Sequence, residues 1–175
     1  MRIQTQLARA LDREEFYLEY QPSVDLHEGC ITGLEALLRW RHPERGMVSP
    51  ATFIPLAEEQ GLIGPIGEMV LRTACRQLRS WLDEGLSLEK ISVNVSGQQL
   101  GRSDFANVVE CALRDAGLSS GHLELELTEA TLTQDGRCEL PLEEQIDQYL
   151  TEMLGALERG DEIPDRGRRQ PTPRR

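Results

Sequence analysis

The sequence lacks any apolar run that approaches the roughly 20 residues of a membrane-spanning helix. Its first residues, MRIQTQLARALDREEF, also lack the apolar core of a secretory signal. From these two absences we expect a protein that works in the cytoplasm and has no membrane partner.

Closely spaced cysteines and histidines are also lacking. A zinc site or a disulfide framework needs such residues at short, regular spacings, and no CxxC pair occurs. We therefore expect reduced thiols, in the core or at the surface, and no metal role for a histidine. The residues concerned are Cys30, Cys75, Cys111, Cys138, His27, His42 and His122.

Positive charge is scarce outside the last residues. The formal net charge is −11, yet residues 166–175 carry five arginines and no acid, so the remainder is more acidic than the total. An acidic body disfavours binding to nucleic acid, and we expect no nucleic-acid partner. Residues 161–175 have no apolar pattern and are predicted to be a disordered Arg/Pro-rich tail, with contact to an anionic partner as the alternative.

The 175 residues, 39% hydrophobic and 28% charged, suit one domain with a core, or a domain with a tail. Hydrophobic patterning predicts a strand hairpin followed by helix, strand, helix and strand, which is typical of an α/β fold with a parallel sheet. Connections of this kind are right-handed, so the strands should lie side by side in sequence order. The expected strands are 16–26, 30–40, 90–97 and 122–130, and the expected helices are 2–14, 51–61, 63–85, 104–118 and an amphipathic helix over 140–157.

Two local features complete this prediction. Residues 42–50, HPERGMVSP, are rich in proline and glycine and are expected to form a loop. Asp104 stands directly before a helical pattern and is expected to cap that helix.

Three polar residues fall on strands that should run parallel. Glu35 lies inside the apolar run LEALLRW, Asn94 lies in ISVNVSG, and Glu129 closes LELELTEA. Ligands bind at the carboxyl ends of parallel strands, and oxygen ligands of this kind suit Mg²⁺, Mn²⁺ or Ca²⁺. Arg39 shares a strand face with Glu35, about 13 Å along, and its planar fork matches a phosphate.

Simpler interpretations stay open at this point. A strand glutamate is often found at the solvated rim, and Asn94 could bond to nearby backbone. Glu124 and Glu126 alternate with leucines, which indicates a partly wet face of the last strand.

The segments EALLRW, HPERGMVSPATFIPLAEEQGLI, SVNVSGQQL and LELELTEA resemble the EAL-domain family in order and spacing over about residues 5–133. The resemblance implies a TIM-like barrel whose first strand is reversed, and hydrolysis of cyclic di-GMP with Mg²⁺ or Mn²⁺. It implies metal ligands at Glu35, Asn94 and Glu129. It also implies nucleotide contacts from Leu38 and Arg39, with Gln21 at the edge of the nucleotide.

The resemblance breaks off after Glu129. The family continues into an Asp-Asp-Phe-Gly strand end and later a catalytic lysine, but this sequence has no Asp-Asp pair, and its only lysine is Lys90. We therefore expect a truncated, degenerate domain at 1–133, a divergent helical segment at 134–160 and the tail at 161–175. The fold would be a partial TIM-like barrel of four strands, the first antiparallel, with a C-terminal amphipathic helix.

Half of such a site predicts one weakly held ion, weak cyclic di-GMP binding and little or no phosphodiesterase activity, because two-metal hydrolysis needs both ions fixed. An open barrel edge could bind a second copy or a partner protein. Three functions remain as alternatives: weak nucleotide binding or protein interaction, a phosphodiesterase completed by self-association or a partner chain, and a scaffold that binds no nucleotide.

Overall fold

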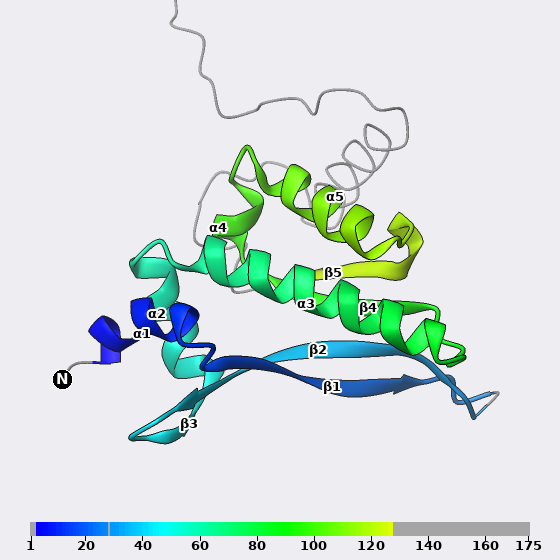
Figure 1. The fold of residues 1–175 in the computed structure, drawn as a ribbon, viewed down its shortest axis with the longest axis horizontal. Coiled ribbons are helices and arrows are strands. Elements are labelled where there is room, and N and C mark those ends of the chain that lie inside the picture. Colours follow the sequence, from blue (N-terminus) through cyan, green and yellow to red (C-terminus); the bar gives the residue numbers. More distant parts are fainter. Residues whose placement is uncertain (1–2, 28, 128–175) are drawn as a thin grey trace, which may run out of the picture.

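The computed structural model describes residues 3–27 and 29–127, and these form an α/β fold with one mixed sheet (Figure 1). The elements in chain order are α1 (Ile3–Asp12), β1 (Phe16–Val24), β2 (Ile31–His42), β3 (Gly46–Val48), α2 (Pro50–Glu59), α3 (Ile63–Asp83), β4 (Lys90–Val95), α4 (Gly97–Leu100), α5 (Phe105–Ala116), η1 (Ser120–His122) and β5 (Leu123–Leu127).

The sheet follows the predicted sequence order. Its strands lie in the order β1-β2-β4-β5, and β3 pairs with β2 beside this path. β1 runs antiparallel to β2, while β2, β4 and β5 are parallel to one another. The α/β prediction with a reversed first strand is therefore confirmed, and the carboxyl ends of β2 and β4 lie at the same end of the sheet.

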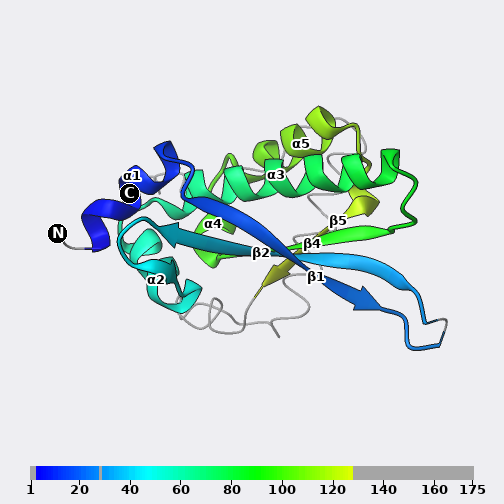
Figure 2. The same cartoon turned by 60° about the horizontal axis from the view of Figure 1, so that its bottom comes forward.

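α3 and α5 lie together over one face of the sheet (Figures 1 and 2). The apolar residues of α3 recur every three to four positions, so one side of the helix is buried against the strands. The buried residues of β4 are Ile91, Val93 and Val95 on one side of the strand, together with Ser92 on the other. This packing fixes the relative positions of β2 and β4.

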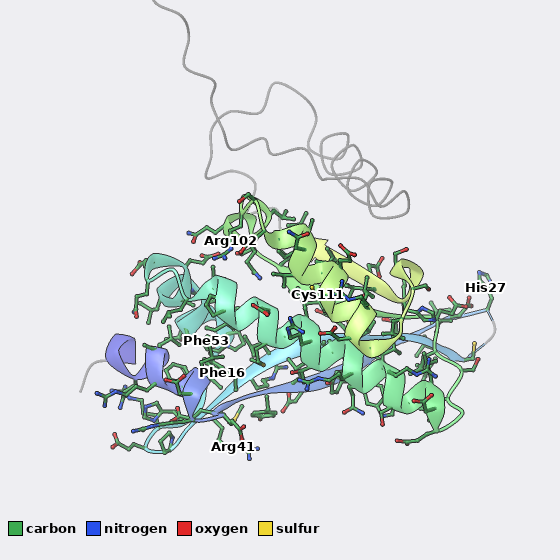
Figure 3. The ribbon with its side chains drawn as sticks, turned by 45° about the horizontal axis from the view of Figure 1, so that its top comes forward. Phe16, His27, Arg41, Phe53, Arg102 and Cys111 are labelled. Carbon is green, nitrogen blue, oxygen red and sulfur yellow. The ribbon has the colours of Figure 1, made fainter. Side chains whose placement is uncertain are left out.

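An aromatic cluster anchors the β1 end of the core. Trp40 is fully buried and its ring centroid lies 5.7 Å from those of Phe16 and Phe53. Phe16 and Phe53 lie close together between β1 and α2, with centroids 5.6 Å apart (Figure 3). The Trp40 indole N–H donates to Glu15 Oε2 over 3.0 Å, so its polar atom is paired although its ring is buried. This cluster holds β2 in place just beyond Arg39.

The structure differs from the sequence-based expectation in three places. Residues 42–50 are not a plain loop, because Gly46–Val48 pairs antiparallel with the end of β2. The short helix α4 was not predicted; Ser96 and Gln99 form a reciprocal capping box at its start. Asp104 stands at the N-cap position of α5 but makes no capping bond, because the Arg102 guanidinium donates to both of its carboxylate oxygens, at 2.9 and 2.8 Å.

Several predictions fall outside the described residues. These are Glu129, Cys138, the helix at 140–157, the divergent segment 134–160 and the tail at 161–175. In the part of the chain that the structure describes, no helix has the length and apolarity needed to cross a bilayer.

Candidate functional site

The site lies on the face of the sheet opposite to α3 and α5, and this face carries polar side chains. Because side chains alternate along a strand, Ala36 and Val93 enter the core, and their neighbours point to the other face. Glu35 and Arg39 on β2 and Asn94 on β4 share this second face. Glu35 is only half-buried. The sequence indicated a carboxylate inside a buried strand, but the side of the strand that carries the carboxylate is open.

Glu35 and Asn94, 59 positions apart in the sequence, are in direct contact. The Asn94 side-chain amide donates from Nδ2 to Glu35 Oε1 over 2.7 Å. The parallel register, in which Glu35 lies opposite Ser92 and Ala36 opposite Val93, brings these two side chains together. Rotation of the Asn94 amide would place its oxygen beside the carboxylate, giving two oxygen ligands side by side.

β5 adds a carboxylate to the same face. Its register places Glu126 directly opposite Asn94, and opposite residues of parallel strands point to the same face. Glu126 is half-buried, in line with this position. The sequence favoured Glu129 and assigned Glu126 to a wet face. The alternation of LELEL does not show the register against β4 that brings Glu126 opposite Asn94, and Glu129 lies outside the described residues.

Arg39 lies at the edge of an open cleft of about 920 Å³ at the carboxyl ends of β2 and β4. Leu38, Arg39 and Asn94 line it from the sheet, and residues 96–99 line it from the β4–α4 segment. The opposite wall comes from α2 and the start of α3, and Figure 2 shows the arrowhead of β2 beside α2. The volume is in the range of small-molecule sites.

Two hydrogen bonds hold the Arg39 guanidinium. Its Nε donates to Glu19 Oε2 on β1 over 2.7 Å, and its Nη1 donates to the Leu38 carbonyl oxygen over 3.2 Å. The Arg39 side chain retains 24% of its exposure, and that of Glu19 retains 51%. Sequence reasoning missed Glu19, because only the β1–β2 pairing brings it to Arg39.

Gln21 on β1 lies opposite Glu35 in the antiparallel register and is exposed. It therefore neighbours the Glu35–Asn94 pair, but it does not line the cleft. The sequence placed Gln21 at the edge of the site, and the register is compatible with that position.

Lys90 lies at the other end of the parallel strands. Its Nζ lies 2.8 Å from Glu124 Oε2, and Ser92 Oγ donates to the same oxygen over 2.8 Å. These two hydrogen bonds lower the pKa of the Glu124 carboxyl from its usual value. The lysine is thus tied to a carboxylate at the start of β4, away from the cleft.

His42 and His27 lie in different parts of the fold. His42 is buried and accepts hydrogen bonds at Nδ1 from the backbone N–H groups of Glu44 and Arg45. His27 lies at the β1–β2 turn, far from the cleft (Figure 3). Within residues 3–27 and 29–127, no three side chains drawn from His, Cys, Asp and Glu are grouped as a metal site.

Known proteins match this chain over most of its length. The family model of the EAL domain matches residues 4–151. The bifunctional diguanylate cyclase/cyclic di-GMP phosphodiesterase MucR of Pseudomonas aeruginosa is 45% identical over 140 residues, 80% of this chain and 20% of MucR. The cyclic di-GMP phosphodiesterase NbdA of the same organism is 40% identical over 146 residues, 83% of this chain and 19% of NbdA. The chain thus spans about a fifth of these curated relatives.

Solved structures share the fold. The MucR phosphodiesterase in complex with cyclic di-GMP aligns with a TM-score of 0.77 and 40% identity, covering 90% of this chain and 60% of that one. The FimX EAL domain from Pseudomonas aeruginosa, bound to cyclic di-GMP, aligns with a TM-score of 0.69 and 26% identity, covering 87% of this chain and 57% of that one.

Proposed function

The chain belongs to the EAL domain family, and from this premise we propose that it binds cyclic di-GMP in the cleft at the carboxyl ends of β2 and β4. The observation that carries the proposal is that Arg39 and Asn94 both line this cleft, with Glu35 hydrogen-bonded to Asn94 on the same face of the sheet. Related proteins of known structure, MucR and FimX, have been solved with cyclic di-GMP, which supports the choice of ligand.

The cleft and its edge carry groups that are complementary to a phosphodiester and to a guanine ring. The Arg39 guanidinium can donate to a phosphodiester through the N–H groups that Glu19 and the Leu38 carbonyl leave free. Leu38 and Ile54 offer apolar surface to a guanine ring. Gln21, beyond Glu35, would contact the ligand at its edge.

The donor set also fits one Mg²⁺ or Mn²⁺ ion. Glu35, Asn94 and Glu126 supply two carboxylates and an amide oxygen from three adjacent strands, and such all-oxygen sets suit these ions. We assign the third position to Glu126 on its register, and keep Glu129, the candidate from the sequence, as the alternative. A bound ion would neutralise phosphate charge beside Arg39.

We expect little or no phosphodiesterase activity from this chain alone. Hydrolysis by two metals needs carboxylates that fix both ions, and within residues 3–27 and 29–127 no three side chains drawn from His, Cys, Asp and Glu are grouped to do so. The only lysine of the sequence, Lys90, is bound to Glu124 at the far end of β4. Lys90 is therefore not placed to act as the acid of the reaction, and the described carboxylates are not placed to complete a second metal site.

Calorimetric titration with cyclic di-GMP in the presence of Mn²⁺ tests the proposal. Arg39→Ala removes charge-assisted hydrogen bonds, each worth about 1.5–3 kcal/mol, so its affinity should fall about ten- to hundredfold. Arg76→Ala is the matched control, because Arg76 is an exposed arginine on α3 whose Nε bonds to a carbonyl of its own helix. Absence of binding, or equal affinity in both variants, would contradict the proposal.

A second candidate is an active phosphodiesterase completed by another chain. Two relatives, MucR and NbdA, are named as phosphodiesterases, and β1 and β5 pair on one side only within the described residues. Such edges can accept a second copy or a partner protein. Turnover to the linear dinucleotide that rises with protein concentration and is lost in Glu35→Ala would favour this candidate. If light scattering shows a monomer and no turnover is measured, this second candidate is excluded and the chain is a protein that binds cyclic di-GMP.

A further inference from the structure

Arg39, which would bind a phosphodiester in the proposed function, already forms an ion pair with the carboxylate of Glu19. Glu19 lies on β1 opposite Leu37 and reaches Arg39, two residues farther along β2. The pair joins the two strands on the polar face of the sheet, at the rim of the cleft. The contact is short and charged, with Nε and Oε2 2.7 Å apart.

Glu19 is itself held in this position. Its second oxygen, Oε1, lies 3.3 Å from the Tyr17 hydroxyl, which donates to it. Arg39 in turn is fixed by Glu19 at Nε and by the Leu38 carbonyl at Nη1. Both partners are therefore oriented by contacts within the chain, and the carboxylate lies against the guanidinium.

From this geometry we infer that Glu19 is a positioning residue that sets the affinity of the cleft by partly neutralising Arg39. The inference rests on the proposed function, in which Arg39 receives a phosphodiester. A ligand phosphate and the Glu19 carboxylate are both anions within reach of one guanidinium, so each weakens the hold of the other. Glu19 also keeps the guanidinium oriented, which an uncharged side chain of the same shape can do.

Glu19→Gln separates these two effects. The glutamine oxygen can still accept from Arg39 Nε, so the orientation is kept while the negative charge is lost. Half-exposed ion pairs are worth little, and the expected gain in cyclic di-GMP affinity is about two- to fivefold. Glu89→Gln is the matched control, since it changes the net charge equally at an exposed residue just before β4, at the opposite end of that strand from the cleft.

The experiment is a calorimetric double-mutant cycle with cyclic di-GMP, using the full chain, Glu19→Gln, Arg39→Ala and the double variant. We expect tighter binding in Glu19→Gln, no such gain in the Arg39→Ala background, no change in Glu89→Gln, and a smaller gain at high salt because exposed charges are screened. A merely structural role for Glu19 would not show this salt dependence.

The outcomes separate the inference from its premise. Weaker or unchanged binding in Glu19→Gln, with Arg39→Ala still impaired, overturns the role of Glu19 and leaves the proposed function standing. An equal gain in the Arg39→Ala background also overturns it, because Glu19 would then act on the ligand directly. Absence of cyclic di-GMP binding in every form overturns the proposed function and the inference with it.

Discussion

Gly67→Ala should destabilise the chain through the floor of the cleft. Gly67 lies in α3 where the helix crosses the buried side chain of Gln99, and a Cβ at this position would lie 2.8 Å from the Gln99 Cδ and closer still to its Nε2. Gln99 is only 4% exposed, and its Oε1 accepts from the Ser96 backbone N–H over 3.1 Å. The added methyl group must therefore displace a packed side chain and break the capping box of α4.

The magnitude follows from three contributions. Overpacking of a closely fitted contact costs about 1–3 kcal/mol, and loss of a helix cap costs about 1 kcal/mol. Replacing glycine by alanine in a helix recovers about 1 kcal/mol. We expect a net loss of about 1–3 kcal/mol in the free energy of unfolding, together with weaker ligand binding because residues 96–99 line the cleft.

Urea unfolding followed by the fluorescence of the two tryptophans measures this change. Gly64→Ala is the matched control in the same helix. Its Cβ would meet the guanidinium of Arg102, with Cζ at 3.1 Å, but this side chain is half-exposed and can swing away. The control should be as stable as the parent or more stable by up to about 1 kcal/mol, the gain from replacing glycine by alanine in a helix.

A double variant tests whether the Gln99 side chain is the obstacle to a methyl group at Gly67. In the Gln99→Ala background the obstacle is gone, so Gly67→Ala should cost nothing or stabilise the helix by about 1 kcal/mol. Stabilisation by Gly67→Ala in the parent chain, or an equal loss in both backgrounds, would refute the close contact between α3 and Gln99.

Two further predictions concern titratable groups. The pKa of Glu124 is lowered by its hydrogen bonds to Lys90 and Ser92, so the stability it contributes is present above the ordinary value of 4.5 and is lost as the pH falls through the folded-state pKa. Unfolding curves across this acidic range should converge for the parent and Glu124→Gln, whereas a constant difference would contradict the linkage. Burial raises the pKa of the Cys75 thiol to about 11, so a thiol reagent at pH 8, followed by peptide mapping, should modify exposed Cys30 quickly and Cys75 only after unfolding. Equal rates at the two thiols would show that Cys75 is accessible.

Much of the fold is readable from the sequence because its signals are local. A run of β-branched residues predicts the strand at 90–97, and an amphipathic pattern predicts the long helix at 63–85. The alternation of strands and helices along the chain predicts the parallel sheet. β3 escapes prediction because three residues carry no period, and its partner lies on another strand. α4 escapes for a similar reason, since its four residues are fixed by one capping box and by the contact with α3.

The candidate site was half predictable for the same reason. Glu35 and Asn94 each interrupt an apolar strand, so each stands out alone, and the structure brings them together. Glu126 and Glu19 stand in ordinary alternating or polar contexts. Their contacts come from strand register, which pairs Glu126 with Asn94 and brings Glu19 to Arg39. Register depends on packing across the whole sheet, which a local pattern does not record.

The most direct test of the account is a nuclear magnetic resonance titration of the labelled chain with cyclic di-GMP, because it locates the ligand. We expect saturable amide shifts at Leu38, Arg39, Asn94 and residues 96–101, with His27 at the hairpin turn unchanged. Unchanged spectra, or shifts confined to surfaces away from the ends of β2 and β4, would contradict the assignment of this cleft as a cyclic di-GMP site.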